Sequence, residues 1–241
     1  MSQAKIFVAM PSYGQISAKA GARFWHASRQ RGVRYVQEGC SLLAHNFNAL
    51  WCTALNSDPR PDYFAMQHAD IEPQEHWLDT LIEELDAHDL DVLSVVIPFK
   101  SPDGLTSTAI GDGPCEPRMP ARRLVMREVQ QLPETFTSED VGGPLLINTG
   151  LWVCRFGDWA QDVCFTINDW VEPDSTGFYR CYVEPEDWNF SRQLHRLGVR
   201  VGATRKIAAK HWGEVGFDNQ WTAYPLETDN ATIEKNAVAM A

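Results

Sequence analysis

The sequence contains no long apolar run, no paired cysteine motif and no excess of basic residues. No hydrophobic stretch approaches the roughly 18 to 20 residues that a membrane-spanning helix needs, and the first residues lack the layout of a signal peptide. We therefore expect a soluble, unexported, cytoplasmic protein without a membrane span. With 21 Lys and Arg against 32 Asp and Glu, the formal net charge is -11, which argues against tight nonspecific binding to duplex DNA. The net charge does not exclude a local basic groove.

The six cysteines form no C-x-x-C pair, and most of them lie in apolar or helical contexts. A free thiol in such a context packs like a small hydrophobic side chain, so we interpret the cysteines as reduced and structural. Hydrophobic residues make up 44% and charged residues 22% of the 241 positions. This ordinary composition excludes a disordered chain and a disulfide-rich miniprotein, and the length suits one domain spanning residues 1–241.

Short apolar runs alternate with segments of helical spacing, which predicts an α/β fold. Strands are expected at 6–10, 33–37, 63–67 and 92–99, with helices at 17–30, from 41 onward and at 74–88. The clearest helix begins at Ser41, because Leu43, Phe47 and Leu50 recur with helical spacing. Strands linked by helices of this length predict a mainly parallel, Rossmann-like sheet with helices on both faces.

The character of the chain changes over residues 100–144, which are dense in Gly and Pro. We expect hairpins and mobile loops there. Order returns with a strand-like segment at 145–156, followed by an expected helix at about 158–171 and a turn at 171–177. A second helix is expected within 184–198, then a strand over 199–206, followed by the segment AAKHWGE at 208–214. The last residues, 216–241, are expected to form a loosely docked tail.

His68 and Asp70 lie directly after the expected strand 63–67. Ligands of open α/β sheets bind at the C-terminal ends of the strands, and alternate residues of an extended segment point to the same side. An imidazole and a carboxylate placed in this way could hold a divalent cation such as Mn or Mg together with a diphosphate. The alternative is an ordinary turn, in which Asp70 or Glu72 stabilises the N-terminus of the next helix.

Two further clusters could carry chemistry. Glu184, Glu186 and Asp187 come directly before the expected helix within 184–198. Such a carboxylate can act as a general base for an attacking hydroxyl, although the helix dipole alone also favours acidic residues there. His211 lies between an expected strand and a loop, where a lone histidine is more often structural than a ligand.

Several segments between about residues 5 and 213 together resemble the GT-A-fold glycosyltransferases, above all the large inverting group that uses nucleoside-diphosphate sugars. FVAMPSYG resembles the opening strand and turn that line the base pocket. AHNFNAL is similar to the A-R-N-x-G-h segment, with Asn46 matching, His45 at the arginine position and Asn48 at the glycine position. QHAD stands at the D-x-D metal motif, with Asp70 matching the last acid and His68 replacing the first.

The second half of the chain extends this resemblance. EDWNFSRQLHRLG matches the spacing E-D-x-x-h-x-x-R-h-x-x-x-G, except that Gln193 takes the arginine position and Arg192 precedes it. INTGLWVCR resembles the small-residue turn that follows the variable acceptor loops, and His211 lies where many members place a late metal-binding histidine.

The resemblance implies a metal-dependent transfer of a sugar from a nucleoside-diphosphate sugar to an acceptor hydroxyl, with inversion. It implies a nucleotide-binding half at 1–99, variable loops at 100–144 and an acceptor and catalytic half at 145–215. The implied donor-binding residues are Pro11, Ser12, Tyr13, His45 and Asn46. The implied ligands of the divalent cation (Mn or Mg) are Asp70 and His211 with His68, and the implied base is Asp187 with Glu186 beside it.

Alternatives remain open at this stage. The same fold could transfer the sugar with retention, or it could belong to a noncatalytic protein that binds nucleotides or sugars. A nucleotidyltransferase is disfavoured, because PSYGQISAKAGAR lacks the glycine-rich signature loop of that class. The acceptor could be a glycan, a lipid-linked sugar, a protein or a modified DNA base. Lys100 and the arginines between 118 and 127 could form a lid or acceptor platform, or simply a solvated surface.

Overall fold

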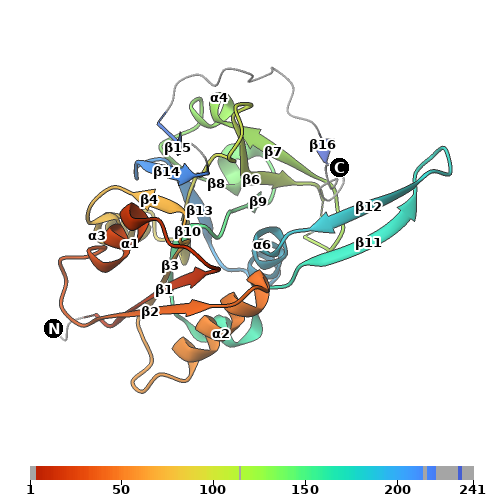
Figure 1. Cartoon of the computed structure of the whole chain (residues 1–241). Helices are drawn as coiled ribbons and strands as arrows, with labels where there is room; N and C mark the ends of the chain where they lie inside the picture. Colours follow the sequence, from red (N-terminus) through yellow and green to blue (C-terminus); the bar gives the residue numbers. More distant parts are fainter. Residues whose placement is uncertain (1–3, 114, 214–215, 221–232, 235–241) are drawn as a thin grey trace.

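A seven-stranded sheet forms the centre of the computed structural model, which describes residues 4–113, 115–213, 216–220 and 233–234. Its strand order is β2-β1-β3-β10-β5-β13-β8 (Figure 1). The strands are β1 (Ile6–Ser12), β2 (Val33–Gly39), β3 (Tyr63–Gln67), β5 (Val92–Val95), β8 (Thr135–Thr137), β10 (Leu151–Arg155) and β13 (Val201–Thr204).

The sheet is mixed, although five of its seven strands run in one direction. β1 pairs in parallel with β2 and β3, and β5 pairs in parallel with β13. β10 runs antiparallel between β3 and β5, and β8 runs antiparallel at the edge beside β13. The prediction of a mainly parallel sheet therefore holds for strand direction, while β10 divides the parallel strands into two groups.

Helices cover both faces of this sheet, as the sequence predicts. One face carries α2 (Leu43–Leu55) and α6 (Glu186–Arg196), whose Phe47, Trp51 and Phe190 belong to the same buried cluster as Trp152 of β10. The other face carries α1 (Ala18–Trp25) and α3 (Trp77–Ala87), which contribute to a second buried cluster. Two apolar layers thus fix the sheet and leave the C-terminal ends of its parallel strands open to ligands.

Smaller sheets lie beside the central one. β6 (Leu105–Gly111) and β7 (Ala121–Val125) form an antiparallel hairpin within the Gly- and Pro-rich middle, where the sequence predicts hairpins. They continue into β9 (Leu145–Leu146) and β16 (Ile233–Glu234), and the short helices α4 (Met126–Val129) and α5 (Ser138–Val141) follow β7 and β8. A three-stranded sheet joins β4 (Ile71–Pro73), β14 (Ala209–Trp212) and β15 (Gly216–Asp218).

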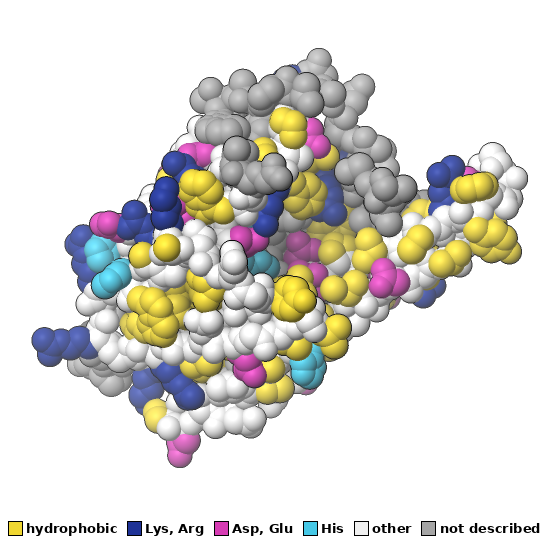
Figure 2. Space-filling model, in the orientation of Figure 1, with side chains coloured by type: hydrophobic (Ala, Val, Ile, Leu, Met, Phe, Trp, Pro, Cys, Tyr) yellow, Lys and Arg dark blue, Asp and Glu magenta, His cyan; other side chains and the backbone are white. Residues whose placement is uncertain are grey.

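The prediction of a helix at 158–171 is wrong. A short 3-10 helix, η1 (Asp158–Asp162), is followed by the hairpin of β11 (Asn168–Pro173) and β12 (Tyr179–Glu184), which projects from the body of the molecule (Figure 1). Stacking of Trp170 on Tyr182 across the two strands, with ring centroids 5.6 Å apart, stabilises the extended pairing. Apolar side chains along this arm face solvent, among them Val171, Phe178 and Tyr179 (Figure 2).

Other sequence expectations have mixed outcomes. All six cysteines are free thiols, but only Cys154 is buried, and three of the others are exposed. Within the part of the chain that the structure describes, no helix is long and apolar enough to cross a membrane. Most of the expected tail, residues 221–232 and 235–241, lies outside the described residues.

Candidate functional site

A pocket of about 290 Å³ opens at the C-terminal ends of β1 and β3. Pro11, Ser12 and Tyr13 line it at the end of β1, and His68 and Asp70 line it after β3. Tyr13 is 77% exposed, so its ring is free to cover a ligand. In Figure 2, acidic and histidine side chains gather in the hollow at the centre of the face. The sequence-predicted base pocket and metal motif thus share one cavity.

Of the two neighbouring residues predicted to bind the donor, Asn46 lines the pocket and His45 does not. Asn46 lines the pocket at the start of α2, and its Nδ2 donates to the carbonyl oxygens of Ser12 at 3.3 Å and Glu38 at 3.1 Å. These bonds tie the ends of β1 and β2 together, and the buried Oδ1 of Asn46 has no hydrogen-bond partner among the described residues. His45 is exposed and is not among the residues that line the pocket.

Asp70 is the charged centre of the site. Its Oδ2 lies 2.5 Å from Nζ of Lys100 and 3.5 Å from Nε2 of His211. Burial alone would raise the pKa of Asp70, but its contacts with His211 and Lys100 outweigh burial and hold the pKa well below its ordinary value. These contacts therefore favour the ionised carboxylate of Asp70. The sequence interpretation missed Lys100 here, because it treated that residue as part of a lid, platform or solvated surface.

The ring of His211 is oriented by the backbone. Its Nδ1 lies 2.9 Å from the carbonyl oxygen of Pro98, which can only accept a hydrogen bond, so Nδ1 carries the proton. Nε2, on the other side of the ring, faces Oδ2 of Asp70 at 3.5 Å and would offer its lone pair to a cation only in the neutral ring. A histidine held by a backbone carbonyl in this way is typical of metal ligands.

His68 is half-buried, it lines both pockets of the site, and its Nε2 atom is buried. Desolvation lowers its pKa to about 4, so the ring is neutral near pH 7. Its backbone N donates to the carbonyl oxygen of Gly150 at 2.8 Å, and its ring packs 5.0 Å from that of Phe47. Nε2 has no hydrogen-bond partner among the described residues, which leaves this nitrogen available to a ligand.

The turn at residues 147–150 (INTG) supports the backbone of His68. Asn148 donates from Nδ2 to the carbonyl oxygen of Val95 at 2.5 Å, and its Oδ1 accepts from the backbone N of Gly150 at 2.9 Å. A side chain on Gly150 would come within 2.6 Å of Ile71 and 3.2 Å of Asn148. A glycine at this position therefore lets the turn approach the segment that carries His68.

Glu186 and Asp187 line a second pocket, of about 140 Å³, together with His68 and His211. Burial raises the pKa of Asp187 well above its ordinary value, and the neighbouring Glu186 raises it further. Arg123, held between the rings of Phe99 and Trp188, acts in the opposite direction. Two adjacent buried carboxyls thus lie at the N-terminus of α6, in one pocket with His211 and with His68, which also lines the first pocket.

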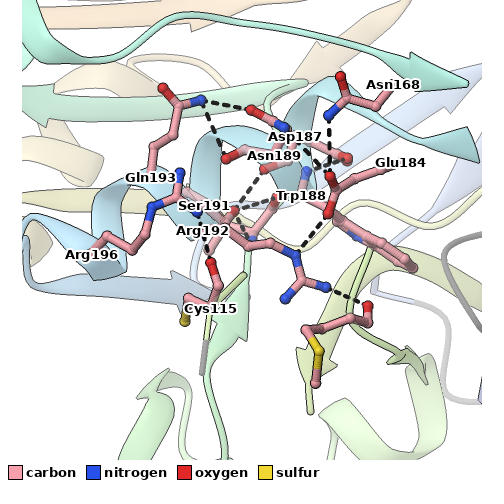
Figure 3. Close-up of polar contacts among 12 residues, drawn as sticks. Cys115, Asn168, Glu184, Asp187, Trp188, Asn189, Ser191, Arg192, Gln193 and Arg196 are labelled. Atoms are coloured by element: carbon pink, nitrogen blue, oxygen red, sulfur yellow. Dashed lines mark hydrogen bonds and ion pairs between the residues drawn. The ribbon is translucent and has the colours of Figure 1, made fainter. Parts of the chain in front are cut away.

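Glu184 belongs to the interior and not to this pocket. Its Oε1 accepts from Nε of Arg192 at 2.8 Å, and both side chains are at most 1% exposed (Figure 3). Arg192 also donates to the carbonyl oxygen of Met119 at 2.7 Å. Gln193, at the family's arginine position, exchanges two hydrogen bonds with the backbone of Cys164 instead. Arg192 therefore anchors α6 from inside the protein.

The donor set fits a cation that is shared with a substrate better than one held by the protein alone. Across the described residues, no three His, Cys, Asp or Glu side chains are grouped so that they could hold a metal ion. Asp70 and His211 nevertheless turn two ligand atoms toward each other, and Mg-like ions commonly take one or two protein ligands plus substrate phosphates.

Comparison with known proteins shows the fold. No family model matches the chain, and no curated protein matches it in sequence. A197 from STIV is similar in structure, with a TM-score of 0.56 and 12% identity over 95% of this chain and 96% of that one. TarS 1-349 from S. aureus aligns with a TM-score of 0.42 and 9% identity over 84% of this chain and 58% of that one. The chain therefore shares the mixed α/β fold of A197 over nearly its whole length.

Proposed function

We propose that this protein is a glycosyltransferase that moves a sugar from a nucleoside-diphosphate sugar to an acceptor hydroxyl with inversion. The observation that carries the proposal is the adjacency of the two pockets. His68 lines both of them, so a cavity at the C-terminal edge of the sheet borders directly on the buried carboxylates of α6. The resemblance of the sequence segments to GT-A-fold enzymes supports the same assignment.

The nucleoside would lie against the end of β1, with its base beside Pro11, Ser12 and the exposed ring of Tyr13. Asn46 would keep the ends of β1 and β2 in place below it. The diphosphate would then extend toward Asp70 and His211, which come from different segments of the sheet edge. This direction brings the sugar to the second pocket.

A divalent cation, Mn or Mg, held by Asp70 and His211 with His68 nearby, would neutralise the charge that develops on the departing diphosphate. The residues of the chain have the other tasks. The backbone carbonyl of Pro98 orients His211, and the INTG turn fixes the backbone of His68. Burial of His68 keeps it neutral and therefore able to donate a lone pair.

Asp187 would act as the general base, with Glu186 beside it. As the acceptor oxygen attacks the anomeric carbon, the bond from that carbon to the diphosphate oxygen breaks, and the acceptor proton passes to the carboxylate of Asp187. A raised pKa suits this role, because a base is most effective when its pKa lies near the working pH. The acceptor class, a glycan, lipid-linked sugar, protein or modified DNA base, is left to experiment.

A ligand panel tests the proposal. Thermal denaturation is measured with nucleoside diphosphates and their sugars, with Mn and with EDTA, followed by an assay of donor hydrolysis. Stabilisation by one nucleotide with Mn, together with release of its diphosphate from the sugar donor, is the expected result. Binding without any turnover would favour the noncatalytic alternative, and no stabilisation by any nucleotide would overturn the proposal.

A further inference from the structure

Lys100 forms an ion pair with Asp70 inside the proposed cation site. Its Nζ is 2.5 Å from Oδ2 of Asp70, the same oxygen that faces Nε2 of His211 at 3.5 Å. Lys100 follows β5, and it meets Asp70 across 30 residues of sequence. The ammonium therefore contacts the carboxylate oxygen that faces His211, where a cation held between Asp70 and His211 would lie.

The charges of this pair cancel in the donor-free protein. Asp70 contributes one negative charge and Lys100 one positive charge, and the two charged atoms Oδ2 and Nζ are only 2.5 Å apart. A paired lysine adds no net positive charge to attract a diphosphate. Lys100 can bind a phosphate effectively only when another cation binds the carboxylate of Asp70 in its place.

We propose, building on the proposed function, that Lys100 is a placeholder for the divalent cation and that it transfers from Asp70 to the donor's diphosphate when cation and nucleotide bind. An ammonium and a divalent cation on one carboxylate oxygen would repel each other strongly. Lys100 therefore opposes cation binding in the empty site and favours nucleotide binding in the loaded one. Cation and nucleotide consequently bind with positive coupling.

The surroundings of Lys100 permit this movement. Its side chain is 38% exposed, and its aliphatic stem lies beside Gly213, where a Cβ would come within 3.3 Å of Cδ of Lys100. The lysine head sits on a flexible four-carbon stem, and surface ion pairs of this kind are weak. Release of Lys100 from Asp70 thus requires only a change of rotamer.

Binding of Mn to the wild type and to Lys100→Met tests the proposal directly. Free Mn is measured by electron paramagnetic resonance without nucleotide, and the binding of UDP and GDP is measured by calorimetry at saturating Mn. We expect Lys100→Met to bind Mn alone about tenfold more tightly and the preferred nucleotide about tenfold more weakly, the change expected from one moderate charge contact. Opposite changes in the two affinities are the signature of a placeholder.

Lys206→Met is the matched control, because it removes a lysine that pairs with Glu84 away from both pockets. It should change neither affinity. Unchanged Mn binding by Lys100→Met overturns the placeholder role while leaving the glycosyltransferase proposal intact. Nucleotide binding that persists in EDTA and is lost in Lys100→Met also overturns it, because the lysine would then replace the cation permanently. Failure of the wild type to bind any nucleotide would instead contradict the proposed function.

Discussion

Nε of Arg192 donates to Oε1 of Glu184 at 2.8 Å, and this ion pair is buried beneath the helix that carries the proposed base (Figure 3). Arg192→Met would leave the carboxylate of Glu184 without its charged partner in the interior. We expect the free energy of unfolding to fall by about 3 to 5 kcal/mol, measured by urea denaturation. Combining it with Glu184→Gln should recover part of this loss, because no buried charge then remains.

The control for this prediction is a half-exposed pair. Arg155 lies 2.8 Å from Asp86 with both side chains more than a third exposed, so Arg155→Met should cost no more than about 1 kcal/mol. Equal losses for Arg155→Met and Arg192→Met would show that burial of the Arg192 pair has no special importance for the fold.

Asp187→Asn separates catalysis from binding. The change keeps the shape of the side chain but removes the proton acceptor, so we expect turnover to fall by roughly a hundredfold or more while donor affinity stays nearly constant. Steady-state kinetics and calorimetry measure the two effects. Glu186→Gln is the companion variant, because adjacent carboxyls can exchange roles. Near-normal turnover in both variants would remove this pair from the mechanism.

The same variant should affect stability in a pH-dependent manner. The pKa of Asp187 is raised in the folded state by burial and by Glu186, with Arg123 opposing, so the folded protein binds the proton more tightly than the unfolded chain. Stability is therefore lost as the pH rises from the ordinary pKa of Asp through the folded-state value. Asp187→Asn should stabilise the protein at pH 7 and lose this advantage toward pH 4.

Thermal denaturation across this pH range measures the prediction, and Asp86→Asn at the surface serves as its control. If Asp187 only complemented the dipole of α6, its substitution would instead destabilise the protein by a few tenths to about 1 kcal/mol at neutral pH. The sign of the change at pH 7 thus distinguishes a destabilising functional carboxyl from a structural one.

Nucleotide binding should depend on a divalent cation and on Asp70. At one hundred times its Kd, UDP or GDP with Mn should stabilise the wild type by about 2.7 kcal/mol, and this gain should disappear in EDTA or in Asp70→Asn. His68→Ala should weaken the effect without abolishing it. Equal stabilisation in Mn and in excess EDTA would contradict the role of the cation.

The sequence by itself determined the elements whose apolar pattern is local. The helical spacing of Leu43, Phe47 and Leu50 predicted α2, and the apolar runs at 6–10 and 63–67 predicted β1 and β3. The placement of His68 and Asp70 at a strand end followed from the same pattern. A periodic apolar face must be buried against something, and this requirement can be recognised within a dozen residues.

The tertiary structure alone decided the contacts between distant segments. β11 is a strand and not a helix because Trp170 stacks on Tyr182 of the partner strand. β10 pairs antiparallel with β3, although a long stretch of chain separates the two strands. Glu184 pairs with Arg192 in the interior and so does not join Glu186 and Asp187 in the pocket. Lys100, in the segment after β5, contacts Asp70, in the segment after β3. Such pairings depend on which loops meet at the sheet edge, and no local periodicity encodes that meeting.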